Sequence, residues 1–215
     1  MIIGIIGALK QEIEPIKSSL IDLKIEKHSG FSFFVGKINN HKIVLTISSV
    51  GKVNMAICAT TLIQKYNPDM LINTGIAGSV NTGIGEVVLS KLTKYYDFIF
   101  DQNENDKGFH GIFKTNKKLL DKALSIVGDD VIVGTVLTGD KFVLSVNDLN
   151  GISLKNVKAI DMESGAFAQT CTRFKKKYLI FRCISDHLNE DDYYQNKIFS
   201  LTQAAEVCLK FVKNI

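Results

Sequence analysis

Apolar runs and helix-like patterns alternate along this chain, and this alternation restricts the fold more than any other feature. The runs that suit β-strands are MIIGIIG, FSFFVG, KIVLTIS, DMLINTG, EVVLSKL, VIVGTVLTG, VKAIDM and YLIFRCIS. Several are continuous, which is typical of strands whose sheet is covered by helices on both faces. Segments with helical spacing lie between them, namely QEIEPIKSSL, VNMAICATTLIQKY, NKKLLDKALSIV, ESGAFAQTCTRF and a C-terminal one near KIFSLTQAAEVCLKFVKNI. We therefore predict an α/β fold with a mixed, largely parallel central sheet flanked by helices.

Length and composition favour one domain. A chain of 215 residues, 46% of them hydrophobic, is long enough to bury roughly 70% of the surface that it exposes when unfolded. It has two prolines, Pro15 and Pro68, and no Ser/Gly-rich run, internal repeat or low-complexity tract that would mark a linker or an array. We expect residues 1–215 to form a single domain.

Charge and hydropathy argue against nucleic-acid and membrane partners. The net charge is +4, and dense basic residues occur only in RFKKK at 173–177, a pattern typical of a solvated helix end. No apolar run reaches 18 residues, and MIIGIIGALKQE lacks the basic start and cleavage site of a signal peptide. We predict a cytoplasmic protein that binds neither nucleic acid nor membrane.

No cofactor is predicted. The four cysteines, which lie in predicted core elements without CxxC spacing, are expected to be buried free thiols: Cys58, Cys171, Cys183 and Cys208. Only Cys183 and His187 are close enough in sequence to suggest a shared metal, and one such pair is not a metal site. The segment GIIGA lacks the G-x-G-x-x-G spacing of a dinucleotide site. We therefore expect neither a bound metal ion nor a dinucleotide cofactor.

Acidic residues follow four of five strand ends at which a ligand would bind in such a fold. Glu12 follows the first strand, Asp140 follows VIVGTVLTG, Asp161 and Glu163 follow VKAI, and Asp186 follows YLIFRCIS. Each one also has a structural explanation, because acids are favoured at helix N-termini and in turns. Taken singly, none of them identifies a site.

Taken together, the strand ends resemble a known family. GIIGALKQEI, SSVGKVNMA, NTGIAGS, TGDKFV, AIDMES and RCISDH occur in the order of the nucleoside phosphorylase/nucleosidase superfamily, and they are most similar to 5′-methylthioadenosine/S-adenosylhomocysteine nucleosidases. The resemblance extends from residue 2 to about residue 210. It implies one α/β domain around a mixed, barrel-like sheet, a homodimer, a small-molecule nucleoside substrate and no cofactor.

The resemblance also implies roles for the acids. Glu12 stands where the family places the carboxylate that activates the attacking water, and Asp186 where it places the acid that protonates the purine at N7. Met162 and Glu163 match the pair that lines the ribose, with the glutamate binding both hydroxyls. Such chemistry needs carboxyl groups in different surroundings, because one must donate a proton while another must be ionised.

The remaining implied site residues surround the base and the catalytic acid. Phe142 matches the aromatic residue that stacks on the base, and the Val143 backbone contacts its edge. Ser185 matches a residue that holds the catalytic aspartate, and Arg182 one near the water and ribose. Gly75 and Ile76 lie in NTGIAGS, whose backbone N–H groups can approach a small ligand closely; Ile76 stands where some close relatives carry a hydroxyl residue.

Water is favoured over phosphate as the nucleophile. A phosphorylase typically holds its phosphate with several arginines, and this chain has only Arg173, in a predicted helix tail, and Arg182. Glu12 would also repel a phosphate. The sequence thus predicts an adenine nucleoside hydrolase; the alternatives are a phosphate-dependent phosphorylase and a non-catalytic nucleoside-binding protein.

Two segments depart from the family pattern or carry no assignment. Residues 95–113 are shorter than the family's usual loop, which helps to close the site and reaches the partner subunit. The stretch HLNEDDYYQNKIF after Asp186 is expected to cover the 5′ substituent of the nucleoside, with Phe199 or a nearby tyrosine as lining. Neither segment identifies which 5′ substituent the protein prefers.

Overall fold

Strands alternate with helices over the described residues, 1–98, 111–149 and 151–215 of a computed structural model. The strands are β1 (Ile2–Gly7), β2 (Ile21–His28), β3 (Phe31–Ile38), β4 (His41–Ile47), β5 (Met70–Gly78), β6 (Val87–Tyr95), β7 (Ile112–Lys114), β8 (Ile132–Thr138), β9 (Val157–Asp161) and β10 (Lys177–Asp186). The helices are α1 (Lys10–Ser18), α2 (Lys52–Tyr66), α3 (Lys117–Val127), α4 (Ser164–Arg173) and α5 (Glu190–Asn214), with short 3₁₀ turns η1 (Gly128–Asp130) and η2 (Val146–Leu149). Every strand and helix predicted from the sequence is present.

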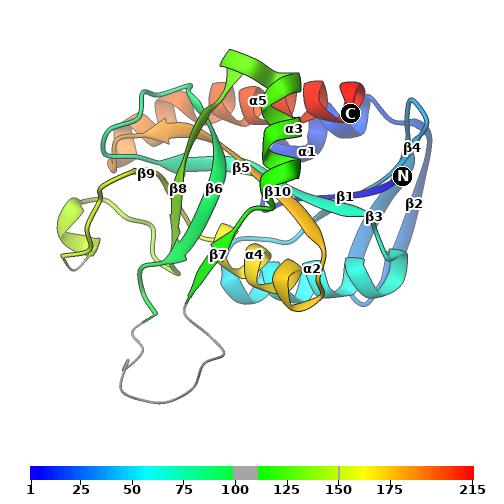
Figure 1. The fold of residues 1–215 in the computed structure, drawn as a ribbon, viewed down its shortest axis with the longest axis horizontal. Helices are drawn as coiled ribbons and strands as arrows, with labels where there is room; N and C mark the ends of the chain where they lie inside the picture. Colours follow the sequence, from blue (N-terminus) through cyan, green and yellow to red (C-terminus); the bar gives the residue numbers. More distant parts are fainter. Residues whose placement is uncertain (99–110, 150) are drawn as a thin grey trace.

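Part of the sheet closes on itself. The strand order is β10-β6-β8-β9-β5-β1-β4-β3-β2, and β5 also pairs with β10, so that five strands form a ring. The β5–β10, β6–β8 and β8–β9 pairs of the ring are parallel, whereas β5–β9 and β6–β10 are antiparallel. Strands β1 to β4 extend the sheet beyond the ring (Figure 1). The predicted mixed, barrel-like α/β fold is confirmed.

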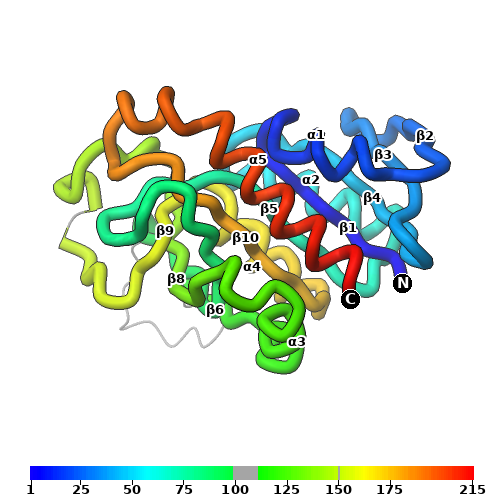
Figure 2. The backbone as a smooth tube through the Cα atoms, turned by 90° about the horizontal axis from the view of Figure 1, so that it is seen from above, coloured from blue at the N-terminus to red at the C-terminus, as the bar shows by residue number. Residues whose placement is uncertain are grey.

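Helices cover both faces of this sheet, which explains the continuous apolar runs. Helices α1 and α5 lie side by side on one face (Figure 2), and α2 and α4 lie on the other (Figure 1). Along β10, Leu179 and Phe181 belong to the core under α1, α3 and α5, whereas Tyr178 and Ile180 belong to the core under α2 and α4. A strand buried on both faces is therefore mostly apolar, and its few polar side chains need partners within the protein. The four cysteines are buried in these cores as free thiols, as predicted.

Three features of the fold were not predicted. Strand β2 was missed because most of its residues are exposed at the sheet edge, so its sequence has no apolar run, and β7 has only three residues. Helix α5 begins at Glu190, earlier than the predicted segment near 197. Its first turn is polar, but Asn189 caps it by accepting a hydrogen bond from the Asp192 N–H at 2.8 Å, and acids are favoured at a helix N-terminus.

Among the described residues, no helix is long and apolar enough to cross a membrane.

Candidate active site

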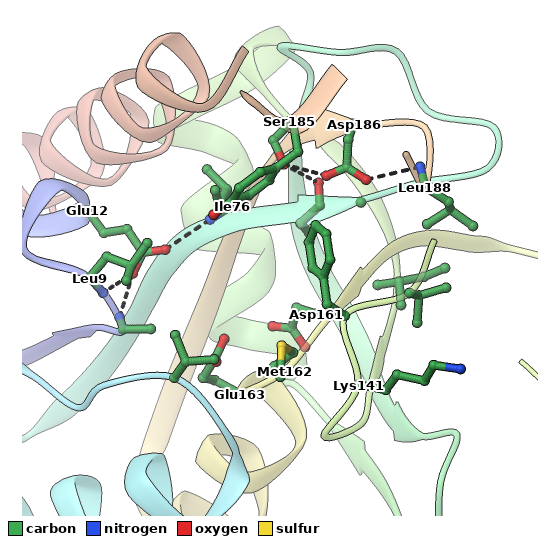
Figure 3. Close-up of a pocket in the computed structure, with 18 residues that line it drawn as sticks. Leu9, Glu12, Ile76, Lys141, Asp161, Met162, Glu163, Ser185, Asp186 and Leu188 are labelled. Carbon is green, nitrogen blue, oxygen red and sulfur yellow. Dashed lines mark hydrogen bonds between the residues drawn. The ribbon is translucent and has the colours of Figure 1, made fainter. Parts of the chain in front are cut away.

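A cavity of about 290 Å³ opens where β1, β5, β8, β9 and β10 end. Eight of the ten residues predicted for the site line this cavity, namely Glu12, Ile76, Phe142, Val143, Met162, Glu163, Ser185 and Asp186. Figure 3 shows the carboxyl groups of Glu12, Glu163 and Asp186 on different sides of it. The other two predicted residues, Gly75 and Arg182, lie behind the cavity wall.

Glu12 is held by backbone N–H groups. It lies in the first turn of α1 and is 4% exposed. Its Oε2 accepts hydrogen bonds from the N–H groups of Ala8 and, at 2.9 Å, Leu9, and its Oε1 accepts one from Ile76 at 3.3 Å. Burial raises the pKa of the Glu12 carboxyl, while the charge of Arg182 and the N–H donors oppose the rise because they favour the ionised form.

Asp186, the last residue of β10, is equally buried but has different hydrogen-bond donors. Its Oδ2 accepts a hydrogen bond from the Ser185 hydroxyl at 2.7 Å, and its Oδ1 accepts one from the Leu188 N–H at 3.0 Å (Figure 3). Burial raises the pKa of this carboxyl, and the two donors only partly oppose the rise. A carboxylic acid with a raised pKa is suited to donate a proton near neutral pH.

Two glycines of β5 leave room for these carboxyl groups. A Cβ on Gly75 would lie 2.5 Å from Oε1 of Glu12, and a Cβ on Gly78 would lie 2.8 Å from Oδ1 of Asp186. Three residues span about 10 Å of an extended strand. The two carboxyl groups can therefore act on different atoms of one ligand.

Glu163 lies between β9 and α4 and is 7% exposed. Its Oε1 accepts a hydrogen bond from the Gly51 N–H, at the start of α2, at 2.9 Å. Burial, together with the negative charge of Asp161, raises the pKa of Glu163 to about 8, against the opposing effects of Arg182 and the Gly51 N–H. Met162, immediately before it, also lines the cavity.

Arg182 was expected near the water and ribose, but its guanidinium is bound within the protein. It is 1% exposed and does not line the cavity. Its Nε donates to Oδ2 of Asp161 at 2.6 Å, and its Nη2 donates to the side-chain oxygen of Asn73. Asp161 also accepts from the Ser164 N–H at 3.1 Å, at the start of α4, in line with the structural explanation that the sequence left open for it. Its ion pair with Arg182 was not foreseen.

Aromatic residues close one side of the cavity. Phe142 is 41% exposed and its ring meets that of Tyr193 edge to face, with centroids 5.1 Å apart. Tyr193 lines the cavity, so the tyrosine alternative proposed for residues 187–199 is favoured. Phe199 does not line it; its ring lies next to Gly85.

The chain matches the phosphorylase superfamily model over residues 2–215. It belongs to that superfamily. The 5′-methylthioadenosine/S-adenosylhomocysteine nucleosidase of Staphylococcus aureus (strain JH9) is 34% identical to it over 199 residues, which cover 87% of each chain. This similarity places the chain in the nucleosidase family that its motifs resemble, so that prediction is confirmed.

Solved structures agree with this assignment to the phosphorylase superfamily. The S-adenosylhomocysteine nucleosidase of Streptococcus pyogenes, in complex with 5-methylthiotubericidin, matches with a TM-score of 0.92 and 26% identity, covering 100% of this chain and 97% of that one. The 5′-methylthioadenosine/S-adenosylhomocysteine nucleosidase of Neisseria meningitidis, in complex with methylthio-immucillin-A, matches with a TM-score of 0.91 and 27% identity, covering 100% and 99%. Both of those proteins were solved with small molecules bound.

Sequence reasoning missed some of the apolar residues that line the cavity. Leu9 and Val50 line it, although the sequence predicted no role for either residue. Leu9 and Val50 follow the ends of β1 and β4, so an inspection of apolar as well as acidic residues at strand ends would have found them. No group of three or more His, Cys, Asp or Glu side chains among the described residues is arranged to hold a metal ion.

Proposed function

We propose that this protein hydrolyses the N-glycosidic bond of 5′-methylthioadenosine- and S-adenosylhomocysteine-type nucleosides and releases adenine. The observation that carries the proposal is the set of three buried carboxyl groups, Glu12, Glu163 and Asp186, in three different surroundings around one cavity. The names of its relatives supply the substrate class.

Asp186 is the proposed general acid. Its protonated carboxyl gives a proton to N7 of the adenine, so that the electron pair of the breaking C1′–N9 bond moves onto the protonated base, which leaves as neutral adenine. A raised pKa keeps the proton available for this step. Ser185, whose hydroxyl donates to Asp186 at 2.7 Å, orients the carboxyl.

Glu12 is the proposed general base. As the C1′–N9 bond breaks, the ribosyl group gains positive charge, and a water molecule attacks C1′ and gives its proton to Glu12. Three backbone N–H groups and the charge of Arg182 favour the ionised carboxylate that this step requires. Arg182 supports this role from behind the cavity wall.

Glu163 and Met162 are the proposed ribose-binding residues. The Glu163 carboxylate accepts hydrogen bonds from the 2′ and 3′ hydroxyls, and Met162 supplies an apolar wall. Burial and the charge of Asp161 raise the pKa of Glu163 to about 8, and hydrogen bonds from the two ribose hydroxyls would favour its ionised form. Phe142 and the Val143 backbone line the cavity and are the proposed contacts of the base, with Tyr193 beside Phe142.

Hydrolysis is favoured over phosphorolysis by the surroundings of the arginines. Arg182 is bound to Asp161 and Asn73, and Arg173 is in the last turn of α4. Neither guanidinium lines the cavity. Glu12, at the proposed nucleophile position, would repel a phosphate dianion.

A homodimer is part of the proposal. Helix α2 exposes Val53 by 68% and Ile57 by 53%, next to Val50 at the cavity, which is 43% exposed. An apolar stripe of this kind is suited to a subunit interface. Residues 99–110 of the shortened loop lie outside the described residues. The molar mass in light scattering tests the dimer, and Val53→Lys is expected to lower it to that of one chain.

The test is to incubate the purified protein with methylthioadenosine in phosphate-free buffer and to measure adenine by chromatography. Adenine release without phosphate is the expected result. Release that depends on added phosphate would favour a phosphorylase. Binding of the nucleoside without release, by protein whose fold is verified by circular dichroism, would favour a non-catalytic binding protein.

A further inference from the structure

An ion-pair network joins three loops at the edge of the cavity. Asp140 follows β8, Asp97 follows β6, and Lys52 is the first residue of α2. Lys52 Nζ lies 2.7 Å from Oδ2 of Asp97 and 3.6 Å from Oδ2 of Asp140. The Asp140 N–H donates to Oδ2 of Asp97 at 2.8 Å. The three side chains therefore hold the ends of three separate elements together.

The start of α2 depends on carboxylates from other parts of the chain. Its N-cap residue is Gly51, which offers no side chain, and its first turn contains no acid. Instead, the Lys52 N–H donates to Oδ1 of Asp140 at 2.8 Å, and the preceding N–H, that of Gly51, donates to Glu163 at 2.9 Å. A carboxylate is favoured at this position, because the first N–H groups of a helix have no partner within the helix.

Asp140 thus links both halves of the proposed nucleoside site. It is two residues before Phe142, whose loop covers the position for the base, and it binds the helix N-terminus whose neighbouring N–H contacts the ribose-binding Glu163. We propose that Asp140 is a positioning residue for nucleoside binding, which fastens the Phe142 loop to the start of α2. This inference rests on the proposed function, and Asp140 itself does not line the cavity.

The first experiment compares kcat, KM and the affinity for adenine in Asp140→Ala, Asp140→Asn and the wild type. Asp140→Ala is expected to raise KM and the adenine Kd by about tenfold, because a loosened loop must be ordered on binding, with kcat changed by less than about threefold. Asp140→Asn keeps an oxygen that can accept from the Lys52 N–H, so it is expected to restore most of the affinity. A purely structural role would lower the melting temperature without changing KM.

The matched control is Asp130→Ala. Asp130 also pairs with a lysine, Lys210, at 2.6 Å and is similarly exposed, with 45% of its side chain accessible against 46% for Asp140. It lies in η1, just before the start of β8, whereas Asp140 follows the end of β8, and Asp130 does not line the cavity. The KM and adenine Kd of Asp130→Ala are expected to equal those of the wild type.

A second experiment needs no ligand. Hydrogen exchange of the backbone amides in peptides that cover residues 49–56 is expected to be faster in Asp140→Ala than in the wild type and in Asp130→Ala. Unchanged exchange together with unchanged KM and adenine Kd in folded Asp140→Ala would overturn the inference. If the wild type releases no adenine, the proposed function fails, and the exchange and adenine-binding data still decide whether Asp140 fastens the loop. If Asp140→Ala does not fold, the same comparison is made with Asp140→Ser.

Discussion

The two ends of the cavity bury a carboxyl group equally but surround it with different donors. Glu12 and Asp186 are 4% and 1% exposed. Glu12 accepts from three backbone N–H groups, which can only donate and so favour the ionised form. Asp186 accepts from one N–H and from the Ser185 hydroxyl. In the proposed mechanism, this difference suits Glu12 to act as the base and Asp186 to act as the acid.

The hydroxyl at the acid end can serve both protonation states. Besides Asp186, the Ser185 hydroxyl lies 3.3 Å from the Ala77 carbonyl oxygen. When Asp186 is ionised, Ser185 donates to it; when Asp186 carries a proton, Ser185 can donate to Ala77 and accept from the acid. Asp186 therefore keeps a partner before and after it gives up its proton, whereas Glu12 has no such exchangeable partner among these three donors.

The largest expected effect comes from removing the proton at the acid end. Asp186→Asn is expected to lower kcat by about 10³- to 10⁴-fold, because an amide cannot supply the proton to the leaving adenine. Nucleoside affinity, measured by calorimetry, should stay close to that of the wild type. The control is Asp191→Asn, an exposed acid in the first turn of α5. A near-normal rate in Asp186→Asn would mean that Asp186 has only a structural role.

Removing the charge at the base end is expected to have the next largest effect. Glu12→Gln should lower kcat by about 10²- to 10³-fold, because the amide cannot take the proton from water. Glu14→Gln, two residues later in α1 and paired with Lys17 on the surface, is the matched control. Single-turnover rates would show the loss directly. Equal rates in the two variants would remove Glu12 from the mechanism.

The two glycines of β5 allow each end to be disturbed separately. Gly75→Ala is expected to displace Glu12, and Gly78→Ala to displace Asp186, because each new Cβ would lie within 3 Å of a carboxylate oxygen. Each should lower kcat by about 10- to 100-fold through misplacement of the reacting group. The pH profile of kcat separates them: Gly75→Ala should change mainly the acidic limb, which reports the base. A change in the same limb for both variants would argue against two independent ends.

The smallest expected effect comes from Ser185→Ala. Its hydroxyl lowers the pKa of Asp186, so its loss should raise that pKa further. The acid acts in its protonated form, which exists below its pKa, so activity should persist to higher pH and the alkaline limb should move upward. The rate at the optimum should fall by about 3- to 10-fold, because the carboxyl is less well oriented. A downward shift of that limb would contradict the assignment of Asp186 as the acid.

The fold was predictable because the local sequence of most strands identifies them as strands. Strands such as β5 and β10 are buried on both faces and so read as continuous apolar runs, with acids or glycines at their ends. Strand β2 gave no such signal, because its edge position leaves most of its side chains in water. The ring closure between β5 and β10 was implied only by the family resemblance, since no local pattern encodes which distant strands pair.

The candidate site was predictable where a motif follows a strand. Glu12, Glu163 and Asp186 were found in this way, and all three line the cavity. The position of the Arg182 side chain was not predictable. Its inward direction depends on Asp161 and Asn73, which lie 21 and 109 residues away in sequence. Contacts between distant segments decide which side chains of a motif face a ligand and which support it from behind.

The parallel pairing of β5 with β10 also sets the order in which the site can be completed while the chain is being made. The hydrogen bond between Ile76 and Glu12 joins residues 64 positions apart in sequence, whereas that between Ser185 and Ala77 joins residues 108 positions apart. The backbone N–H donors to Glu12 are therefore complete in sequence long before a ribosome has made β10, whereas Arg182 and the acid end lie in the last fifth of the chain. Because such long-range pairing is slow, the return of activity during refolding should lag behind the return of helical structure. A nascent or truncated chain that lacks β10 would hold Glu12 without Arg182 and without the proposed acid, and we expect it to be inactive.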